Sequence, residues 1–497
     1  MSTHPVLAIY RDLDAKRDRP ALYDGDVALT HGALIERVEA AAAAIGARVA
    51  PGARVGLCAA NTWRHVVAYL AIMRAGAVWV PLNPRNGPTL NGEFARRAGL
   101  DLVLCDAESD ASLDQRIARV SLEAFLDAAP SASPPPLNAG SDDTFAIKFT
   151  GGSTGVPKGV VQTVRSGARA MASLEAFYGF NADEVNLAVA PLTHGSSHYV
   201  IPVLAAGGAH VLMARPDRAA MLDELKRRVS IVFMPPTLIQ LLMSEAHFTP
   251  QDFPRLRHLT YSAAPMAPAA IERAIERFGP VLSTVYGQTE APMTITGLQP
   301  YELQRPELRA SVGRAFAGTD VAVLTAEGGI EPRGEGEVIA RGDLAASSYL
   351  DDPAQTEASR HDGWLKTGDI GRIDENGYLY LNGRSKEMII TGGYNVYPAE
   401  VERALAAHPA VSEACAFAVA DEVWGERLEA AVCAADANEA ALLSFVRDQL
   451  GPVRTPKRLH FLAALPRNPV GKVVRTDVRD LIYETTSARQ VREEQGA

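Results

Sequence analysis

Cysteine is scarce in this sequence, and the few cysteines form no metal-binding or disulfide pattern. Cys58, Cys105, Cys415 and Cys433 are far apart, lie in apolar runs and include no CxxC pair. Zinc sites and small disulfide scaffolds depend on closely spaced cysteines. The sequence therefore argues against both and predicts four thiols in the protein core.

Long uninterrupted apolar runs are also missing. The first twenty residues lack the continuous apolar stretch of a signal peptide, and the most apolar later segment, residues 66–82, is broken by Arg74 and Gly76. We therefore expect no integral membrane association and a cytoplasmic location.

Basic tracts are absent as well. The chain has 49 Lys and Arg against 59 Asp and Glu, a net charge of −10, and no cluster of basic and aromatic residues. This balance excludes nucleic acid as an expected partner. Any anionic ligand must be bound by locally placed lysines, arginines and backbone N–H groups.

What the sequence does contain is an alternation of strand-like and helix-like segments. At 497 residues the chain is too long for one hydrophobic core, so two unequal domains are expected. Between residues 34 and 285 the alternation predicts an α/β domain with mostly parallel sheets, which includes a helix over 62–74 and a strand over 185–192. After Gly318, short strands and glycine-rich turns predict a small antiparallel, barrel-like subdomain. Beyond residues 383–386 the pattern predicts a small α+β domain with a helix over 439–450.

The stretch FAIKFTGGSTGVPKGV, residues 145–160, is the most informative segment. A strand with alternating apolar residues leads into a loop of glycines, the hydroxyls of Thr150, Ser153 and Thr154, and Lys158. Glycines let backbone N–H groups converge on an anion, while hydroxyls and an ammonium add further donors. The composition predicts a loop that binds a triphosphate.

Three other kinds of loop share parts of this pattern. A P-loop requires glycine directly before the lysine, and Pro157 stands there instead. Residues 151–155 match GxSxG, with Ser153 as a hydrolase nucleophile, but that motif must lead into a helix, which Pro157 and Gly159 disfavour. A plain Gly/Ser surface turn does not account for the preceding strand and the lysine. A serine hydrolase remains the remote alternative.

With four further motifs, the chain resembles the adenylate-forming superfamily of acyl-CoA synthetases, aryl-CoA ligases, luciferases and adenylation domains. The motifs stand in that family's order and cover nearly the full length. Besides the loop they are TVYGQTE at 284–290, WLKTGDIGRID at 364–374, GRSKEMIITGGYNVYPAEVE at 383–402 and PRNPVGKVVR at 466–475. Five motifs in register leave little room for a chance match.

The resemblance implies two domains that move relative to each other. Residues 1–383 would form the N-terminal domain that binds ATP and the acid. Residues 384–497 would form a small mobile C-terminal domain that carries a catalytic lysine and rotates about a hinge near Lys386. The boundary found from composition at residues 383–386 agrees with this division.

The resemblance also implies a reaction. A carboxylic acid attacks ATP to give an acyl adenylate and pyrophosphate, and the acyl group then passes to coenzyme A. Glu290 matches the acid that binds Mg²⁺, Thr289 the hydrogen-bond donor to the α-phosphate, and Arg384 the partner of ribose and phosphate. Lys472 matches the lysine that contacts the carboxylate and α-phosphate during adenylation. ATP, Mg²⁺ and coenzyme A are thus the expected substrates and cofactor.

For the nucleotide, Asp369 is expected to accept the ribose hydroxyls, and Tyr286 to stack on adenine with Ala263 on its flank. The ATP-binding residues implied by the resemblance are Thr150, Ser153, Thr154, Gly155, Lys158, Ala263, Tyr286, Gly287, Gln288, Thr289, Asp369, Arg384 and Lys472.

For the other substrates, the resemblance assigns His194 and Tyr286 to the acyl pocket and Gly392, Gly393 and Trp424 to the coenzyme A passage. His194 and His198 have the spacing of metal ligands, but no glutamate follows His194 and no third ligand is evident. The polar run at residues 196–199 is compatible with an aryl or functionalised acid. The sequence departs from the usual family pattern at Gly152, Ser348 and Thr391, where one small residue replaces another.

Alternatives to an acyl- or aryl-CoA ligase stay open at this point. Adenylation followed by transfer to the phosphopantetheine of a carrier protein is the nearest. A catalytically silent acyl-nucleotide binding protein is a third class, disfavoured by the intact Glu290, Arg384 and Lys472. A homodimer is compatible with the sequence, and the identity of the acid is not determined by it.

Overall fold

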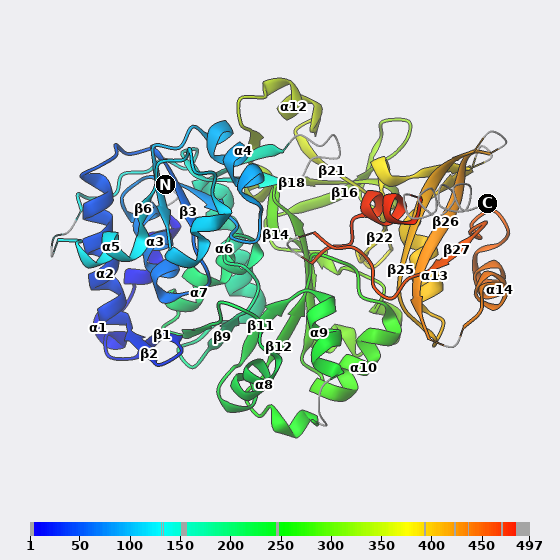
Figure 1. Cartoon of the computed structure of the whole chain (residues 1–497), viewed down its shortest axis with the longest axis horizontal. Helices are drawn as coiled ribbons and strands as arrows, with labels where there is room; N and C mark the ends of the chain where they lie inside the picture. Colours follow the sequence, from blue (N-terminus) through cyan, green and yellow to red (C-terminus); the bar gives the residue numbers. More distant parts are fainter. Residues whose placement is uncertain are drawn as a thin grey trace, which may run out of the picture.

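A computed structural model gives the three-dimensional arrangement of the chain (Figure 1). It describes residues 4–130, 132, 134–150, 157–244, 248–391, 394–421, 424–435, 437–468 and 471–483. The large N-terminal part contains three sheets, and a smaller C-terminal part with a fourth sheet lies to one side of it.

The first sheet has seven strands in the order β19-β8-β7-β4-β3-β5-β6. Strands β7, β4, β3, β5 and β6 are parallel, whereas β8 and β19 are antiparallel to their neighbours. The strands are β3 (Arg54–Cys58), β4 (Val78–Leu82), β5 (Leu102–Cys105), β6 (Val120–Ser121), β7 (Thr144–Thr150), β8 (Lys158–Thr163) and β19 (Ser348–Tyr349).

The second sheet has nine strands in the order β15-β14-β13-β12-β11-β9-β10-β1-β2. Its middle is parallel, and its two edges turn antiparallel at β2 and β14. The strands are β1 (Pro20–Asp24), β2 (Val27–Thr30), β9 (Val185–Ala188), β10 (Ala209–Leu212), β11 (Ile231–Met234), β12 (His258–Tyr261), β13 (Leu282–Gln288), β14 (Ala291–Leu298) and β15 (Arg314–Ala315).

Helices of the N-terminal part pack against these two sheets. Helix α3 begins where the side chain of Thr62 accepts a hydrogen bond from the His65 N–H, which caps its first turn. The α-helices are α1 (Leu13–Lys16), α2 (His31–Gly46), α3 (Trp63–Arg74), α4 (Pro88–Ala98), α5 (Leu122–Asp127), α6 (Val164–Tyr178), α7 (Val200–Ala205), α8 (Arg218–Arg227), α9 (Pro236–Met243), α10 (Pro268–Phe278), α11 (Pro300–Leu303) and α12 (Pro353–Ala358). Short 3-10 helices are η1 (Pro5–Tyr10), η2 (Ala107–Ser112), η3 (Gly195–Tyr199), η4 (Pro250–Asp252), η5 (Pro306–Leu308), η6 (Asp343–Ala345) and η7 (Ser385–Glu387).

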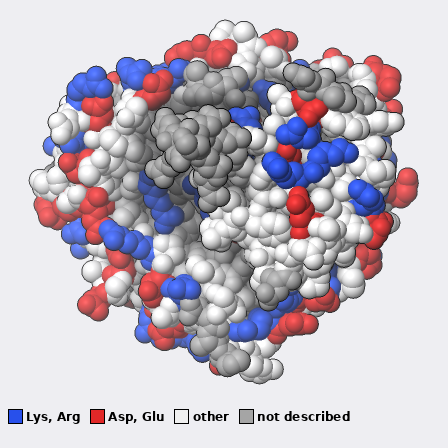
Figure 2. Space-filling view, turned by 45° about the vertical axis from the view of Figure 1, so that its right-hand side comes forward, with Lys and Arg blue, Asp and Glu red and all other residues white. Residues whose placement is uncertain are grey.

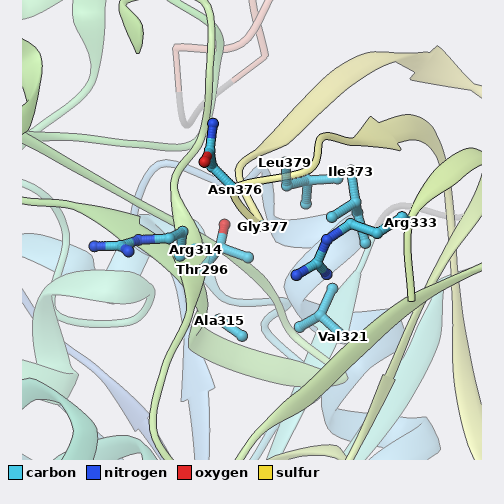
Figure 3. A pocket seen from close by; sticks show the side chains of 9 residues that line it. All are labelled: Thr296, Arg314, Ala315, Val321, Arg333, Ile373, Asn376, Gly377 and Leu379. Carbon is cyan, nitrogen blue, oxygen red and sulfur yellow. The ribbon is translucent and has the colours of Figure 1, made fainter. Parts of the chain in front are cut away.

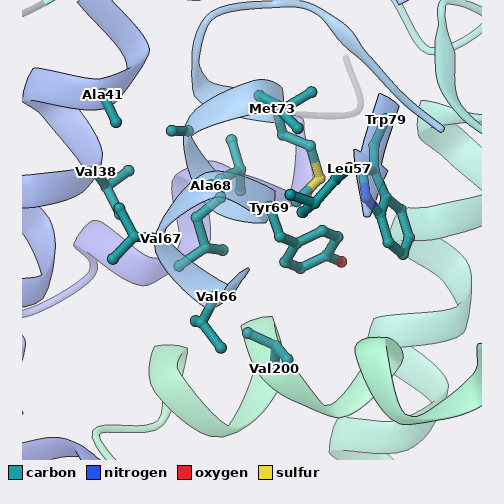
Figure 4. Close-up of a cluster of buried hydrophobic side chains, with 14 of the residues drawn as sticks. Val38, Ala41, Leu57, Val66, Val67, Ala68, Tyr69, Met73, Trp79 and Val200 are labelled. Carbon is teal, nitrogen blue, oxygen red and sulfur yellow. The ribbon is translucent and has the colours of Figure 1, made fainter. Parts of the chain in front are cut away.

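The largest hydrophobic cluster lies where α2, α3 and α7 meet the first sheet (Figure 4). The fully buried Trp79 of β4 packs edge-on against Tyr69 of α3, with ring centroids 4.6 Å apart. Val200 of α7 belongs to the same cluster and links it to the second sheet. This shared core joins the two sheets.

An antiparallel sheet of six strands follows in the chain, as the glycine-rich turns predicted. Its order is β17-β16-β18-β21-β20, and β22 also pairs with β21. The strands are β16 (Asp320–Leu324), β17 (Ile330–Glu331), β18 (Gly334–Arg341), β20 (Arg360–His361), β21 (Trp364–Ile373) and β22 (Leu379–Arg384). The pairing of β21 with β22 carries the chain to the C-terminal part.

The C-terminal part has its own sheet and core. Val401, Leu405, Leu428 and Leu442 are fully buried there between the sheet and two helices. Its elements are β23 (Ile389–Thr391), β24 (Tyr394–Val396), α13 (Pro398–Ala406), β25 (Val411–Asp421), β26 (Gly425–Ala434), α14 (Glu439–Leu450) and β27 (Leu459–Phe461), followed by a helical stretch at residues 475–483. The predicted α/β architecture with a large N-terminal and a small C-terminal part is confirmed.

Two local expectations differ from the structure. The strand expected over residues 185–192 ends at Ala188, before Pro191, which lacks the N–H that a strand ladder needs. The return strand β8 after the glycine-rich loop was not anticipated. All four cysteines are free and buried, as predicted. No helix in the described part of the chain has the length and apolarity to cross a membrane.

Candidate active site

The glycine-rich loop joins two antiparallel strands. Strand β7 ends at Thr150, β8 begins at Lys158, and these two residues are paired in register. The intervening residues 151–156, which include the predicted ligands Ser153, Thr154 and Gly155, lie outside the described residues. A hydrolase nucleophile elbow requires a strand that turns into a helix. Because this loop leads into a strand, the chain does not have that geometry.

Lys158 points toward a segment from much later in the chain. Its Nζ donates a hydrogen bond to Oε1 of Gln355 at 2.5 Å and lies 5.5 Å from the centre of the Tyr349 ring. Tyr349 belongs to β19, which pairs with β8. The Tyr349 hydroxyl in turn donates to Oε1 of Glu290 at 2.7 Å. Lys158 and Glu290 therefore lie on either side of one tyrosine.

Glu290 lies in the tight turn between β13 and β14, and its backbone is fixed from two sides. Nε2 of Gln162, on β8, donates to the Thr289 carbonyl at 2.8 Å. The Ser347 hydroxyl donates to the Glu290 carbonyl at 2.6 Å. These bonds hold Thr289 and Glu290 beside β8, the strand that follows the glycine-rich loop.

The turn that carries Glu290 depends on a glycine. A Cβ atom on Gly287 would lie 2.5 Å from the backbone nitrogen of Met293, closer than any real side chain allows. Gln288 next to it donates from Nε2 to the Thr367 carbonyl at 3.2 Å. Ala263, at the carboxyl end of β12, has a left-handed backbone with φ of 70°. Both segments lie at the carboxyl ends of parallel strands, where α/β sheets bind ligands.

Asp369, Arg384 and Tyr286 form one hydrogen-bonded group. Asp369 and Arg384 are paired in register across β21 and β22, and Arg384 Nε donates to Asp369 Oδ1 at 3.0 Å. The Tyr286 hydroxyl donates to the other oxygen, Oδ2, at 2.5 Å. Burial, followed by the Asp369 charge, raises the pKa of the Tyr286 hydroxyl well above its ordinary value. The tyrosine therefore remains a donor to a carboxylate that is only 7% exposed.

Lys472 comes from the C-terminal part and reaches the same group. A turn in which Asn468 Oδ1 accepts from the Lys472 N–H presents it, and in Figure 1 the red segment that carries it extends toward the N-terminal part. The residue as a whole is exposed to solvent, but the surrounding protein desolvates its ammonium group. This desolvation, followed by the positive charge of Arg384, lowers the pKa of Lys472, while Glu387 and Asp369 act in the opposite direction.

The predicted hinge residue Lys386 lies in η7, directly after β22. Its neighbour Glu387 accepts a hydrogen bond at 3.0 Å from Nε of Arg475, three residues after the predicted catalytic lysine. The segment that carries Lys472 is thus anchored to the connection between the two parts. Figure 2 shows lysine and arginine side chains gathered on both sides of a hollow on one face of the molecule.

His194 lies at the start of η3, on the other side of the site. Its Nε2 lies 3.1 Å from Nδ2 of Asn83, and burial, with Lys148 as the next cause, lowers the pKa of His194 to about 4. A Cβ atom on Gly195 would lie 2.9 Å from Sδ of Met293, so this segment packs tightly on β14. His198 is paired elsewhere, with Nδ1 3.1 Å from the Gly195 carbonyl. The two imidazoles thus serve different partners.

The coenzyme A residues are described only in part. Gly392 and Gly393 lie outside the described residues. Trp424 is 43% exposed, and the Lys457 ammonium lies 4.6 Å from the centre of its ring. An exposed aromatic beside a cation offers a surface on which a flat ligand group can pack.

A separate hollow of about 280 Å³ lies at the far ends of β21 and β22 (Figure 3). Its walls include Arg314 and Arg333, but Arg314 already pairs with Glu302 at 3.0 Å and lies over the Tyr378 ring. None of the predicted site residues lines it.

Several residues of the site were missed from the sequence. They are Tyr349, Gln355, Gln162, Ser347, Asn83 and Lys148. Tyr349 and Gln355 lie almost 200 positions after the loop they contact. No local pattern marks a residue whose only role is set by the pairing of distant strands. Lys148 carried a signal, since a lysine within an apolar strand is unusual.

Comparison with known proteins decides the family. Residues 9–350 match the AMP-binding enzyme family, and residues 400–472 match the AMP-binding enzyme C-terminal domain. The chain belongs to the AMP-binding enzyme family. This assignment agrees with the adenylate-forming resemblance of the five motifs.

Relatives of this AMP-binding enzyme include several CoA ligases. It is 31% identical to a medium/long-chain-fatty-acid–CoA ligase of Mycobacterium tuberculosis, over 97% of this chain and 90% of that protein. It is 33% identical to a feruloyl-CoA synthase of an Amycolatopsis species, over 92% and 95%. Among solved structures, an amide bond synthetase from Marinactinospora thermotolerans superposes with a TM-score of 0.88 at 30% identity, covering 96% of this chain and 99% of that one.

Proposed function

We propose that this AMP-binding enzyme is an AMP-forming acid–thiol ligase that uses ATP to activate a carboxylic acid and then transfers the acyl group to coenzyme A. The observation that carries the proposal is the convergence of charged groups from distant motifs. Lys158 and Glu290 are joined through Tyr349, and Asp369 is joined to Arg384 and Tyr286. Lys472 interacts electrostatically with the second group.

The first half-reaction makes and breaks bonds at one phosphorus atom. An oxygen of the substrate carboxylate attacks the α-phosphorus of ATP, the bond to the β-phosphate oxygen breaks, and pyrophosphate leaves with that electron pair. Two anions must approach each other, so the enzyme has to compensate charge and align the groups. Lys472 and Arg384 supply positive charge at the reacting centre, and Thr289 donates to the α-phosphate.

The remaining nucleotide contacts follow from the arrangement of the loops. Asp369 accepts hydrogen bonds from the ribose hydroxyls, for which Arg384 and Tyr286 hold it in place. Tyr286 and Ala263 flank the adenine. The phosphates are bound by the glycine-rich loop and the β13–β14 turn, with Thr150, Ser153, Thr154, Gly155, Lys158, Gly287 and Gln288 as the proposed contacts.

Glu290 is the proposed ligand of Mg²⁺. The described residues contain no cluster of three or more His, Cys, Asp or Glu that could hold a metal alone. A single carboxylate such as that of Glu290 fits Mg²⁺, which proteins often bind through one or two carboxylates together with the substrate's phosphates. When bound, the ion would neutralise charge on the phosphates. Tyr349 then orients the Glu290 carboxylate by its hydrogen bond.

The second half-reaction requires a different set of residues at the same place. The thiol sulfur attacks the carbonyl carbon of the acyl adenylate, loses its proton, and AMP leaves. We assign residues 1–383 and 384–497 to two domains. A rotation of the second domain near Lys386 would remove Lys472 from the site. The same rotation would bring Gly392, Gly393 and Trp424 to the thiol. Closure also keeps water from the reactive adenylate.

The acid pocket is assigned to the region between His194 and Tyr286. The low pKa of His194 keeps its imidazole neutral at physiological pH, so it can line a pocket for an apolar acyl group without an added charge. The names of two similar proteins specify a fatty acid and a feruloyl group, so fatty and aromatic acids both belong in a substrate screen.

Coenzyme A is the proposed acceptor, and a carrier-protein phosphopantetheine is the second candidate. The similarity to an amide bond synthetase adds an amine as a third acceptor to be tested. The expected partners are small molecules, the expected location is the cytoplasm, and a homodimer is compatible with the sequence.

The test is a release assay followed by a transfer assay. Purified protein with Mg·ATP and a panel of aryl, short, medium and long-chain acids should release pyrophosphate in an acid-dependent manner. The activating acid should then give a thioester with coenzyme A, detected by mass spectrometry. Release without transfer to coenzyme A, but with transfer to a carrier protein or an amine, would reassign the acceptor. Absence of acid-dependent release across the panel would refute the proposed function.

A further inference from the structure

Lys148 is a buried cation that the proposed reaction does not use. It lies on β7, two positions before the end of the strand, and is only 6% exposed. Lysine is rarely buried unless its ammonium is paired. Within the described part of the chain, Lys148 Nζ has no hydrogen-bond acceptor and no ion-pair partner, and it lies 5.0 Å from the centre of the Trp79 ring.

A second buried lysine shows what a structural role looks like in this fold. Lys16 is 5% exposed, and its Nζ donates to the carbonyls of Leu204 at 2.9 Å and Ala205 at 3.1 Å. Those carbonyls belong to the last turn of α7, so this ammonium caps a helix end. Lys148 makes no comparable hydrogen bonds within the described part of the chain, although it is about as buried as Lys16.

The surroundings of Lys148 hold further unpaired polar atoms. Buried side-chain atoms without a hydrogen-bond partner include Nε1 of Trp79 and Nε2 of His198. The Trp79 ring lies 5.0 Å from Lys148 Nζ, and the charge of Lys148 acts on His198. Buried polar groups are normally satisfied, and each unpaired one costs free energy. Two such atoms on residues near the Lys148 ammonium indicate a place prepared for a polar ligand group.

Lys148 also lies near the residues of the acid pocket. After burial, its positive charge is the next cause that lowers the pKa of both His194 and His198. His194 is the residue that faces Asn83 at the proposed acid pocket. Asn83 directly follows β4, the strand that pairs with β7 in parallel, so the neighbouring ends of these two strands place the Lys148 ammonium beside the pocket in which the acyl chain is expected.

We infer that Lys148, with the indole N–H of Trp79, binds a second carboxylate at the far end of the acid substrate. The enzyme would then act on dicarboxylic acids and activate one carboxylate while Lys148 holds the other. This inference rests on the proposed ligase function and names its substrate class. An anion is the ligand group that compensates a buried ammonium best, because it supplies both charge and acceptor oxygens.

The experiment compares acids of equal length that differ only at the far end. Dicarboxylic acids of four to ten carbons, their monomethyl esters and the matched monocarboxylic acids are assayed for ATP-dependent pyrophosphate release. The wild-type enzyme should prefer the best diacid over its ester and monoacid by about tenfold or more in kcat/KM, the magnitude of a charged hydrogen bond. Lys148→Met should lose that preference, so that its kcat/KM values for the diacid, the ester and the monoacid differ by no more than about twofold.

Two controls separate binding from structure. Lys16→Met removes the helix-capping lysine, so it should lower the Tm while leaving the diacid preference intact. Lys148→Gln, which keeps a shorter uncharged donor, should retain part of the preference and rule out misfolding as the cause. The Tm of Lys148→Met should be equal to or above that of the wild type, since the variant loses an unpaired buried charge.

Other outcomes overturn the inference in distinguishable ways. Release with monoacids but no preference for diacids would refute the second-carboxylate site and leave the ligase function standing. A preference for hydroxylated aryl acids over diacids, lost in Lys148→Met, would refute the anionic ligand in favour of a hydroxyl. Equal loss of activity on every acid in Lys148→Met would make the lysine structural. Absence of release with all acids would refute the ligase function itself.

Discussion

At the scale of single residues, the candidate site pairs its carboxylates with tyrosine hydroxyls. Tyr349 donates to Glu290 and Tyr286 donates to Asp369. A hydrogen bond to a charged group contributes about 1.5–3 kcal/mol, more than one between neutral groups. A phenol adds no charge of its own, so its hydrogen bond orients a carboxylate without neutralising it, and Asp369 is in addition paired with Arg384. Such carboxylates stay available for a metal ion or for ribose hydroxyls.

The predicted role of Lys472 is specific to adenylation. Lys472→Ala should lower the rate of acyl-adenylate formation by about 10²–10³-fold, because it removes a preorganised positive group from the charged transition state. The same variant should convert a supplied acyl adenylate and coenzyme A to thioester at nearly the wild-type rate. Both rates can be measured in single-turnover experiments.

Lys226, an exposed lysine on α8, provides the matched control. Lys226→Ala should leave both half-reactions unchanged. An equal loss of both half-reactions in Lys472→Ala would contradict the assigned role.

Tyr286 should act on nucleotide binding rather than on chemistry. Tyr286→Phe keeps the ring that is proposed to flank adenine but removes the donor to Asp369. We expect the KM for ATP to rise about fivefold, equivalent to roughly 1 kcal/mol, with little change in kcat. Tyr380→Phe is a suitable control, because Tyr380 also contacts an aspartate, Asp374, at 3.4 Å but outside the proposed ATP contacts. A fall in kcat at unchanged KM would show that the hydroxyl serves the chemical step instead.

Lys148 should make stability depend on pH in a definite direction. Burial lowers its pKa from 10.5 to about 7, so between these pH values the unfolded chain binds the extra proton. The free energy of unfolding then rises with pH from about 7 to about 10.5, and the penalty is complete below pH 7. The Tm gain of Lys148→Met over the wild type should therefore be largest near pH 6 and shrink toward pH 10. A gain that does not vary with pH would exclude an unpaired ammonium.

At the scale of elements, the site is assembled from loops at strand ends. The turn after β13, the segment after β12 and the loop after β7 all leave the carboxyl ends of parallel strands. A late, short strand, β19, then adds to β8 and brings Tyr349 between two of these loops. The sheets thus fix the positions of residues that are far apart in sequence.

The β13–β14 turn should not tolerate a side chain at Gly287. Gly287→Ala would place a Cβ atom 2.5 Å from the Met293 nitrogen, so the turn that carries Glu290 must shift. We expect a lower Tm and a loss of pyrophosphate release greater than the loss of folded protein, measured at a temperature where the variant remains folded.

Gly46 at the end of α2 gives the contrasting case. A Cβ atom there has nothing within 4 Å, and alanine is the better helix former. Gly46→Ala should therefore stabilise the fold by up to about 1 kcal/mol without changing activity. An unchanged Tm and activity in Gly287→Ala would contradict the close packing of the turn.

Element types were predictable where local pattern and tertiary environment agree. Helix α3 was expected from its apolar residues after Thr62, and the cap is present in the structure. Helix α14, over Glu439–Leu450, matches its predicted bounds. Strand β8 was missed because its pairing with β7 is decided across a loop whose glycines predict only a turn. The partners of Lys158 were beyond prediction for the same reason.

At the scale of the whole molecule, the two parts meet through a narrow connection. Strand β22 ends at Arg384, β23 begins at Ile389, and η7 with Lys386 lies between them. A groove of about 650 Å³ separates α10 from α13 and α14, lined among others by Pro268, Arg403 and Leu450. An open groove beside a short connection leaves room for one part to turn against the other.

Lys386→Pro should separate the two half-reactions. The 3-10 geometry of η7 has φ near −50 to −70°, which proline matches, so the present arrangement with Lys472 at the site should persist. Rotation to a different φ would be blocked. We expect adenylation within about threefold of the wild type and loss of thioester formation by 10-fold or more, on the assumption that this rotation gates the second step.

Lys386→Ala, which leaves φ free, should retain both half-reactions. If Lys386→Pro kept the full rate of thioester formation, rotation at this position would not be required for the second step.

The sequence by itself determined the family, the order of the motifs and the types of most elements. These depend on local patterns: glycines that permit a turn, apolar periodicity that buries a face, and charged residues retained within motifs. The tertiary structure alone decided which side chains meet, such as Tyr349 with Glu290 and Lys158 with Gln355. It also decided that Lys148 is buried beside Trp79 with no hydrogen-bond acceptor among the described residues. Contact and burial depend on how distant strands pair and pack, and that information is not contained in any single stretch of the chain.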